Sequence, residues 1–205
     1  VQDAAAAIPA RLMRDIAGKR VLDLCAAPGG KTLQLAAAGA QVTALDLSAN
    51  RLERLRENLT RCQLQAEVIT GDALEHTGQY DAILLDAPCS ATGTIRRHPD
   101  LPHATVGEHI SGLIGLQAQM LDHALGLLAP SGRLVYATCS LLPDEGECQI
   151  EEALARHPGL RVVPPQAPGL DPDWISAEGG LRLRPDYWAD RGGMDGFYIA
   201  VLEIA

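Results

Sequence analysis

Residues 20–32 read Arg20-Val21-Leu22-Asp23-Leu24-Cys25-Ala26-Ala27-Pro28-Gly29-Gly30-Lys31-Thr32, a short apolar strand that leads through a glycine turn into a helix. Gly29 and Gly30 allow the main chain to approach a ligand closely. The first turn of the helix that we expect over residues 31–38 offers N–H groups without helical partners. This strand, turn and helix therefore predict a binding corner for a nucleotide-like ligand.

The alternation of strands and helices continues along the chain. We expect six more strands, at 41–47, 66–70, 80–85, 133–137, 160–163 and 197–204. We expect the other helices at 11–17, 49–62, 110–128 and 144–156, with Ser48 and Asp144 as caps of the second and fourth. A stretch rich in proline and glycine, 164–195, precedes the last strand. The pattern predicts a doubly wound α/β fold with a mostly parallel seven-stranded sheet and an antiparallel last strand.

The composition favours one folded domain over residues 1–205, with 1–19 as a lead-in segment. Apolar residues make up 47% of the 205 residues, and no apolar run approaches the roughly 18 residues of a membrane helix. The net charge of −9 argues against broad, non-specific binding of nucleic acid by this segment alone. The five cysteines lack C-x-x-C spacing, which favours reduced thiols in a cytoplasmic protein over a disulfide framework or a zinc site.

Three nucleotide-type ligands compete for the glycine turn. Residues 30–32 match the end of a phosphate-binding P-loop, but Cys25 stands where its first glycine belongs, and the G-x-G-x-x-G of dinucleotide-binding proteins is absent. S-adenosylmethionine is favoured because Asp46 ends the second strand, where a carboxylate accepts from ribose hydroxyls, and Asp72 would lie by the adenine. The alternative is that both acids are turn residues or helix caps.

Two cysteines follow strands in matching settings, Pro88-Cys89-Ser90 and Thr138-Cys139-Ser140. Because the carboxyl ends of parallel strands meet at one edge of a sheet, we expect both thiols to face one pocket, beside Asp86. A thiolate can add to C6 of a cytosine and make C5 nucleophilic, and Asp86 could contact the N3 side of the base. The spacing does not decide which thiol attacks. The alternative for each cysteine is a buried apolar role, which we assign to Cys25, Cys62 and Cys148.

The loop after Cys89 carries Arg96-Arg97-His98, a candidate contact for RNA phosphates; the alternative is an ordinary solvated loop. His98, His103 and His109 are spaced irregularly and predict no metal site.

Several segments resemble the NOL1/NOP2/Sun family of RNA cytosine-C5 methyltransferases. They are residues 25–32, Asp86-Ala87-Pro88-Cys89-Ser90 and Thr138-Cys139-Ser140, together with 93–100 and 195–198, which are most similar to the bacterial members that act on small-subunit rRNA. The resemblance covers nearly the whole chain.

The resemblance implies a Rossmann-like class I fold and S-adenosylmethionine as the cofactor. It implies a cofactor site lined by Cys25, Ala26, Ala27, Pro28, Gly29, Gly30, Lys31, Asp46, Asp72 and Asp86. It assigns Cys139 as the nucleophile and Cys89 to release of the enzyme from the adduct. It also implies an N-terminal RNA-binding region outside this segment, which would reconcile the acidic charge with an RNA substrate.

We therefore expect methylation of cytosine C5 in rRNA through a covalent bond between cysteine and C6, without a metal or a membrane. The alternatives are a tRNA or other RNA cytosine-C5 methyltransferase, a methyltransferase for DNA or a small molecule, and a non-catalytic RNA-binding or ribosome-assembly module of the same fold.

Overall fold

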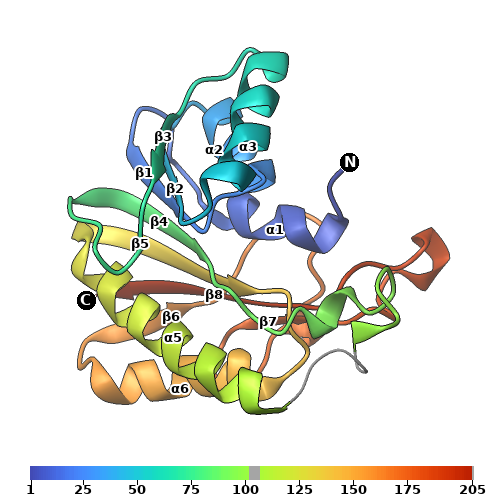
Figure 1. The fold of residues 1–205 in the computed structure, drawn as a ribbon. Helices are drawn as coiled ribbons and strands as arrows, with labels where there is room; N and C mark the ends of the chain where they lie inside the picture. Colours follow the sequence, from blue (N-terminus) through green and yellow to red (C-terminus); the bar gives the residue numbers. More distant parts are fainter. Residues whose placement is uncertain (102–106, 205) are drawn as a thin grey trace.

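The computed structural model describes residues 1–101 and 107–204, with only the main chain for 107–109 (Figure 1). Its strands are β1 (Arg20–Leu24), β2 (Gln41–Asp46), β3 (Glu67–Thr70), β4 (Tyr80–Asp86), β5 (Leu128–Thr138), β6 (Leu160–Val163), β7 (Leu181–Leu183) and β8 (Phe197–Ile204). Its helices are α1 (Ala4–Leu12), α2 (Gly30–Ala37), α3 (Ala49–Cys62), α5 (Gly107–Gly126) and α6 (Glu147–Arg156). The short 3-10 turns are η1 (Thr92–Thr94), η2 (Pro143–Glu145), η3 (Pro172–Trp174) and η4 (Ala189–Arg191).

The strands form one sheet in the order β3-β2-β1-β4-β5-β8-β6. Neighbouring strands from β3 to β5 are parallel, whereas β8 runs antiparallel to both β5 and β6. This confirms the predicted doubly wound, mostly parallel sheet with an antiparallel last strand. The seven predicted strands all form, and the bounds of the sixth and last are as predicted.

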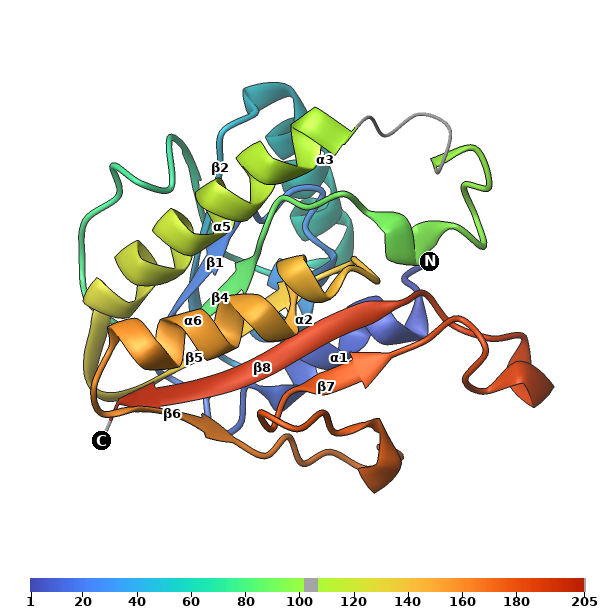
Figure 2. The ribbon, with the colours of Figure 1, turned by 90° about the horizontal axis from the view of Figure 1, so that it is seen from below.

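The sheet has an eighth strand that the sequence does not reveal. Strand β7 lies within the stretch 164–195 and pairs with the first part of β8, whereas β6 pairs with the second part. The two short strands thus follow one another along the same edge of β8 (Figure 2). The sequence predicts no strand in this stretch, because three residues between proline and glycine turns are too few to show a period of two.

Three of the predicted helices have bounds that differ by more than one residue from those in the structure; the one expected at 110–128 is α5, which spans Gly107–Gly126. The helix expected at 11–17 forms earlier in the chain, as α1 (Ala4–Leu12). It begins there because the Asp3 carboxylate accepts from the N–H of Ala5 at 2.9 Å. It does not extend to residue 17, and Asp15 has a left-handed φ of 56°. Asp144 caps no helix; it lies in η2, and α6 begins at Glu147. Ser48, in contrast, accepts from the N–H of Arg51 as the predicted cap of α3.

Helices cover both faces of the sheet. Apolar residues of α5 and α6 pack with Leu22, Ile83, Leu85, Leu134 and Tyr136 on one face. Helices α1 and α2 pack with Val21, Leu84 and Val135 on the other, where residues of the stretch 164–195 also contribute, and α3 packs beside them over β2. Consecutive residues of β4 therefore face opposite layers, which is why the strand reads as continuously apolar. Among the described residues, no helix has the length and apolar character needed to cross a membrane.

The fully buried Leu84 of β4 provides a test of this core. Replacing it with alanine leaves a cavity between the sheet and the α1 layer, and Leu84→Ala should lower the free energy of unfolding by about 2–5 kcal/mol in urea denaturation. Leu47→Ala is the matched control, since Leu47 is 74% exposed. Equal losses for the two variants would contradict this placement of Leu84.

Candidate active site

The carboxyl ends of β1, β2, β4 and β5 lie side by side and carry the residues that the sequence singles out. The glycine turn follows β1, Asp46 ends β2, Asp86 ends β4, and Cys139 follows β5. The structure brings these residues together. Asp72 follows β3, the next strand outward, and is exposed; its carboxylate accepts from the N–H of Leu74 at 2.9 Å.

The carboxylate of Asp46, at the end of β2, connects the glycine turn to this strand by a hydrogen bond. One carboxylate oxygen accepts from the N–H of Ala27 at 3.0 Å, and the other accepts from the N–H of Ser48 at 2.9 Å. Gly29 has a left-handed φ of 99°, and a Cβ there would overlap the side chain of Leu55. These contacts fix the main chain of the turn and point the first turn of α2 toward the strand ends.

Lys31 projects from the first turn of α2 to the end of β4. Its Nζ lies 2.6 Å from the Asp86 carboxylate and 5.5 Å from the centre of the Phe197 ring. Burial favours the neutral amine, but the carboxylate of Asp86 outweighs it and raises the pKa of Lys31. The ion pair ties the turn after β1 to the segment that precedes Cys89.

Asp23 lies beneath this pair, inside β1, and its role is not evident from the motif around it. The side chain is buried, one oxygen accepts from the hydroxyl of Thr32 at 2.6 Å, and the other has no hydrogen-bond partner among the described residues. Burial raises the pKa of Asp23 to about 7. An acid inside an apolar strand is the sequence signal that marks it.

The two predicted thiols meet. The Sγ atoms of Cys89 and Cys139 are 3.4 Å apart, and both side chains are partly buried. The hydrogen bond from Cys89 lowers the pKa of Cys139, although burial acts against it, and Lys31 also favours the thiolate. The thiol of Cys89 donates this hydrogen bond, and this donation, together with burial, raises the pKa of Cys89. These effects favour the thiolate at Cys139 over a thiolate at Cys89.

A glycine that the sequence analysis does not single out holds the main chain of Cys139. The N–H of Gly93 donates to the carbonyl of Cys139 at 2.9 Å, and the N–H of Gly196 donates to the carbonyl of Gly93 at 2.8 Å. A Cβ on Gly93 would overlap the carbonyl group of Gly196. The close approach of three main-chain segments requires glycine here, a constraint that appears only when the segments are placed in space.

The predicted phosphate contacts are largely engaged within the protein. Arg97 donates two hydrogen bonds, at 3.0 and 2.6 Å, to one oxygen of the buried Asp195 carboxylate, and Arg96 pairs with Asp3 at 3.0 Å. The hydrogen bonds to Asp195 raise the pKa of Arg97. His98 is exposed. Contact of these three residues with RNA remains a prediction.

His103 lies outside the described residues, as does the side chain of His109. Within the part of the chain that the structure describes, no three His, Cys, Asp or Glu side chains are grouped so that they could hold a metal ion.

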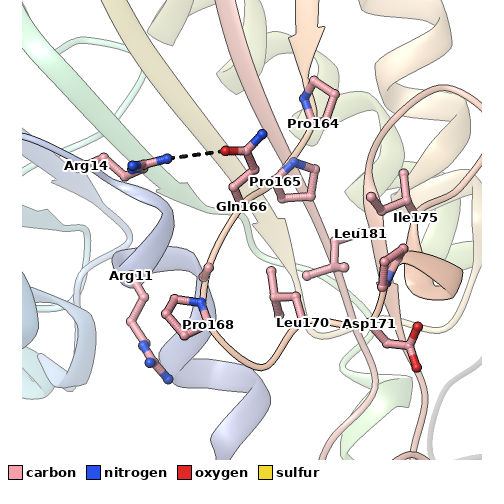
Figure 3. Close-up of a pocket in the computed structure, with 12 residues that line it drawn as sticks. Arg11, Arg14, Pro164, Pro165, Gln166, Pro168, Leu170, Asp171, Ile175 and Leu181 are labelled. Carbon is pink, nitrogen blue, oxygen red and sulfur yellow. Dashed lines mark hydrogen bonds between the residues drawn. The ribbon is translucent and has the colours of Figure 1, made fainter.

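A separate cavity of about 580 Å³ lies between Arg11 and Arg14 and the proline-rich segment 164–172 (Figure 3). Arg14 donates to Gln166 at 3.5 Å at its rim. Neither thiol and none of the strand-end acids lines this cavity, so it is distinct from the site around Cys139.

Comparison with known proteins finds similar sequences over nearly the whole chain. A family model described as 16S rRNA methyltransferase RsmB/F matches residues 11–203. Ribosomal RNA small subunit methyltransferase B of Vibrio cholerae is 46% identical over 99% of this chain and 45% of its own length. The protein of the same name from Pseudomonas putida is 47% identical over 98% of this chain and 46% of its own. The chain thus spans a little less than half the length of these relatives.

A solved structure is also similar over nearly the whole chain. The crystal structure of NSun6 from Pyrococcus horikoshii with SFG has a TM-score of 0.87 and 28% identity, and the match covers 99% of this chain and 52% of that one.

The raised pKa of Asp23 predicts a pH dependence of stability. An unfolded Asp releases its proton near pH 3.8, whereas the folded chain holds it to about pH 7, so the contribution of Asp23 to stability falls as the pH rises through this window. Asp23→Asn removes that contribution. Between about pH 4 and pH 8, the free energy of unfolding of the wild type should therefore fall by ~4 kcal/mol more than that of the variant.

Urea denaturation across this pH range measures the difference, with the exposed carboxylate of Asp100 replaced by Asn as the control. Parallel curves for the wild type and Asp23→Asn would mean that Asp23 is already ionised in the folded protein at low pH.

Proposed function

This chain belongs to the 16S rRNA methyltransferase RsmB/F family, and we propose that it methylates C5 of a cytosine in small-subunit rRNA, with S-adenosylmethionine as the methyl donor. The observation that carries the proposal is the pair of thiols 3.4 Å apart beside Lys31 and Asp86. Cytosine-C5 chemistry needs a thiolate and a second group close to the same ring carbons, and this pair supplies both.

The residues at the strand ends fit S-adenosylmethionine. Each oxygen of Asp46 accepts one main-chain N–H and keeps a lone pair that can accept from a ribose hydroxyl. The first turn of α2, from Gly30, offers main-chain N–H groups, whereas those of Ala26, Ala27 and Gly29 are bonded within the protein. Asp72 is exposed one strand further out, and Asp86 lies near the thiols. When bound, the cofactor supplies an electrophilic methyl group.

Cys139 is the proposed nucleophile. Its thiolate adds to C6 of the cytosine, which gives C5 the electron density of an enolate. The hydrogen bond from Cys89 and the nearby ammonium of Lys31 lower the pKa of Cys139 and so favour that thiolate. Asp86, held by Lys31, is the proposed contact to the N3 side of the ring.

Cys89 is the proposed release residue. Loss of the C5 proton to water leaves the electrons of the C–H bond to restore the C5–C6 double bond, and the sulfur of Cys139 leaves as a thiolate. Cys89 lies 3.4 Å from that sulfur and is therefore in position to assist this step.

The RNA must present a cytosine that is single-stranded or flipped out of its helix, because the thiols cannot reach C6 in a stacked base. Arg96, Arg97 and His98 flank the site and are the proposed phosphate contacts; Arg96 and Arg97 are 38% and 48% exposed. The relatives are about twice as long as this acidic chain. We propose that a region outside this segment provides the rest of the RNA affinity. An rRNA substrate places the activity in the cytoplasm.

A covalent trap tests the reaction and both cysteine roles. The protein is mixed with S-adenosylmethionine and a small-subunit rRNA fragment that contains 5-fluorocytosine, which blocks release, and denaturing electrophoresis detects the complex. Cys139→Ala should give no complex. With unmodified RNA, Cys89→Ala should accumulate the adduct, because release is slowed.

Cys62→Ala, at an exposed free thiol, is the control and should behave as the wild type. A covalent complex formed by Cys139→Ala would show that Cys139 is not the nucleophile. If neither this chain nor a version extended to the length of its relatives forms the complex, although both still bind the cofactor, the result would support a non-catalytic module instead.

The cofactor site is tested through Asp46. Asp46→Asn removes the charge that accepts from the ribose, and should weaken S-adenosylmethionine binding by ~1–3 kcal/mol, roughly 5- to 150-fold in Kd, by calorimetry. Asp122→Asn is the matched control, since Asp122 pairs with Arg156 and His157 near the end of α5, at the opposite edge of the sheet. Unchanged affinity in Asp46→Asn would exclude Asp46 from the cofactor site.

A further inference from the structure

One buried carboxylate, that of Glu145, lies between the two cysteine segments and has no part in the reaction proposed above. Its Oε1 accepts from the N–H of Ser90 at 2.9 Å and from the amide of Gln117 at 3.0 Å. Its Oε2 accepts from the hydroxyl of Ser90 at 2.5 Å. Both oxygens thus bind the residue that follows Cys89.

The main chain of Glu145 is fastened to the other cysteine segment. Its carbonyl accepts from the hydroxyls of Tyr136 and Thr138, each at 3.0 Å. Both lie among the last three residues of β5, and Thr138 directly precedes Cys139. Glu145 therefore connects the end of β5, through its carbonyl, with the turn of Cys89, through its carboxylate.

Neighbouring side chains complete the link. The hydroxyl of Ser140 lies 3.2 Å from those of both Ser90 and Thr92. The amide of Gln117, which projects from α5, also donates to the carbonyl of Pro88 at 2.9 Å. The residues on both sides of Cys89 and the residue after Cys139 thus share one hydrogen-bonded network around the Glu145 carboxylate.

We propose, on the basis of the function proposed above, that Glu145 is a positioning residue that holds the Pro88–Ser90 turn against Cys139 and Ser140 and so keeps the two thiols within hydrogen-bond distance. A buried carboxylate is costly unless donors compensate it, and here the donors come from the Cys89 turn and Gln117. If the turn moves away, the carboxylate loses both donors of Ser90 and keeps only that of Gln117.

The charges around the thiols define a measurable consequence. Cys89 faces Cys139, Tyr136 and Glu145. Cys139 faces Asp86, Lys31 and Arg97. The hydrogen bond from Cys89 is the largest influence that lowers the pKa of Cys139. If the Cys89 turn moves, that hydrogen bond is lost and the pKa of Cys139 rises, so the reactivity of Cys139 reports the position of the turn.

The first experiment measures the rate of Cys139 alkylation by iodoacetamide against pH, by mass spectrometry, without RNA or cofactor. Glu145→Ala should move the midpoint upward by ~0.5 pH unit or more. Glu145→Gln should largely reverse this shift, because the amide oxygen still accepts from Ser90 and Gln117. Glu203→Ala is the control with no shift, since Glu203 pairs with Arg133 and Arg161 at the opposite end of the sheet.

The second experiment measures methyl transfer to an rRNA fragment. Glu145→Ala should lower kcat roughly 10- to 100-fold, the usual cost of a misplaced reacting group, with the Kd for S-adenosylmethionine unchanged. Glu145→Gln should recover most of that loss.

An unchanged alkylation midpoint in a folded Glu145→Ala protein would overturn the proposal, as would a Gln variant as impaired as the Ala variant. If Glu145→Ala does not fold, the variant Ser90→Ala is used in its place, because this change removes the hydroxyl donor to Glu145 and keeps the main-chain N–H donor. A Cys139 alkylation midpoint that does not move upward in Ser90→Ala would overturn the proposal. Alkylation requires no methyl transfer. If Glu145→Ala shifts the midpoint but the wild type does not methylate rRNA, the result would contradict the proposed function and leave the positioning role of Glu145 supported.

Discussion

The parallel register between β4 and β5 is the constraint on which the site depends. Asp86 lies opposite Ala137 in this pairing, so the segments that carry Cys89 and Cys139 leave the sheet side by side. A shift by one residue would turn the side chains of either strand to the opposite face and separate the thiols. Leu84 and Val135 pack on one side and Ile83, Leu85 and Tyr136 on the other, and this two-sided burial keeps the register fixed.

Several ionisable groups are buried near this edge, and each has a specific partner. Lys31 pairs with Asp86, Asp23 accepts from Thr32, and Glu145 accepts from Ser90 and Gln117. Buried charges contribute little to stability by themselves, but removing one partner is strongly destabilising. The arrangement thus confines the segments around the thiols to one geometry.

The stretch between β6 and β8 contributes to the same site. Arg182 of β7 donates to the carbonyl of Ser140 at 2.5 Å, pairs with Glu147 of α6 and lies over the ring of Tyr198. Cys139 is therefore held from three sides: by Gly93 at its own carbonyl, by Arg182 at the next carbonyl, and by Glu145 through the end of β5. A segment that reads as irregular in sequence supports the residue with the proposed central role.

The sequence by itself determined the alternation of strands and helices, because apolar runs and the glycine turn after Leu24 are local signals. It also indicated that Asp46, Asp86, Cys89 and Cys139 lie at or just after the ends of strands, and hence that they would gather at one edge. The tertiary structure alone decided which thiol carries the lower pKa, since that depends on the hydrogen bond between two sulfur atoms 50 residues apart in the chain. It also decided that Arg96 and Arg97 pair with Asp3 and Asp195, that β7 joins the sheet, and that Gly93 and Glu145 hold the cysteine segments. These contacts join residues far apart in sequence, and no local pattern encodes them.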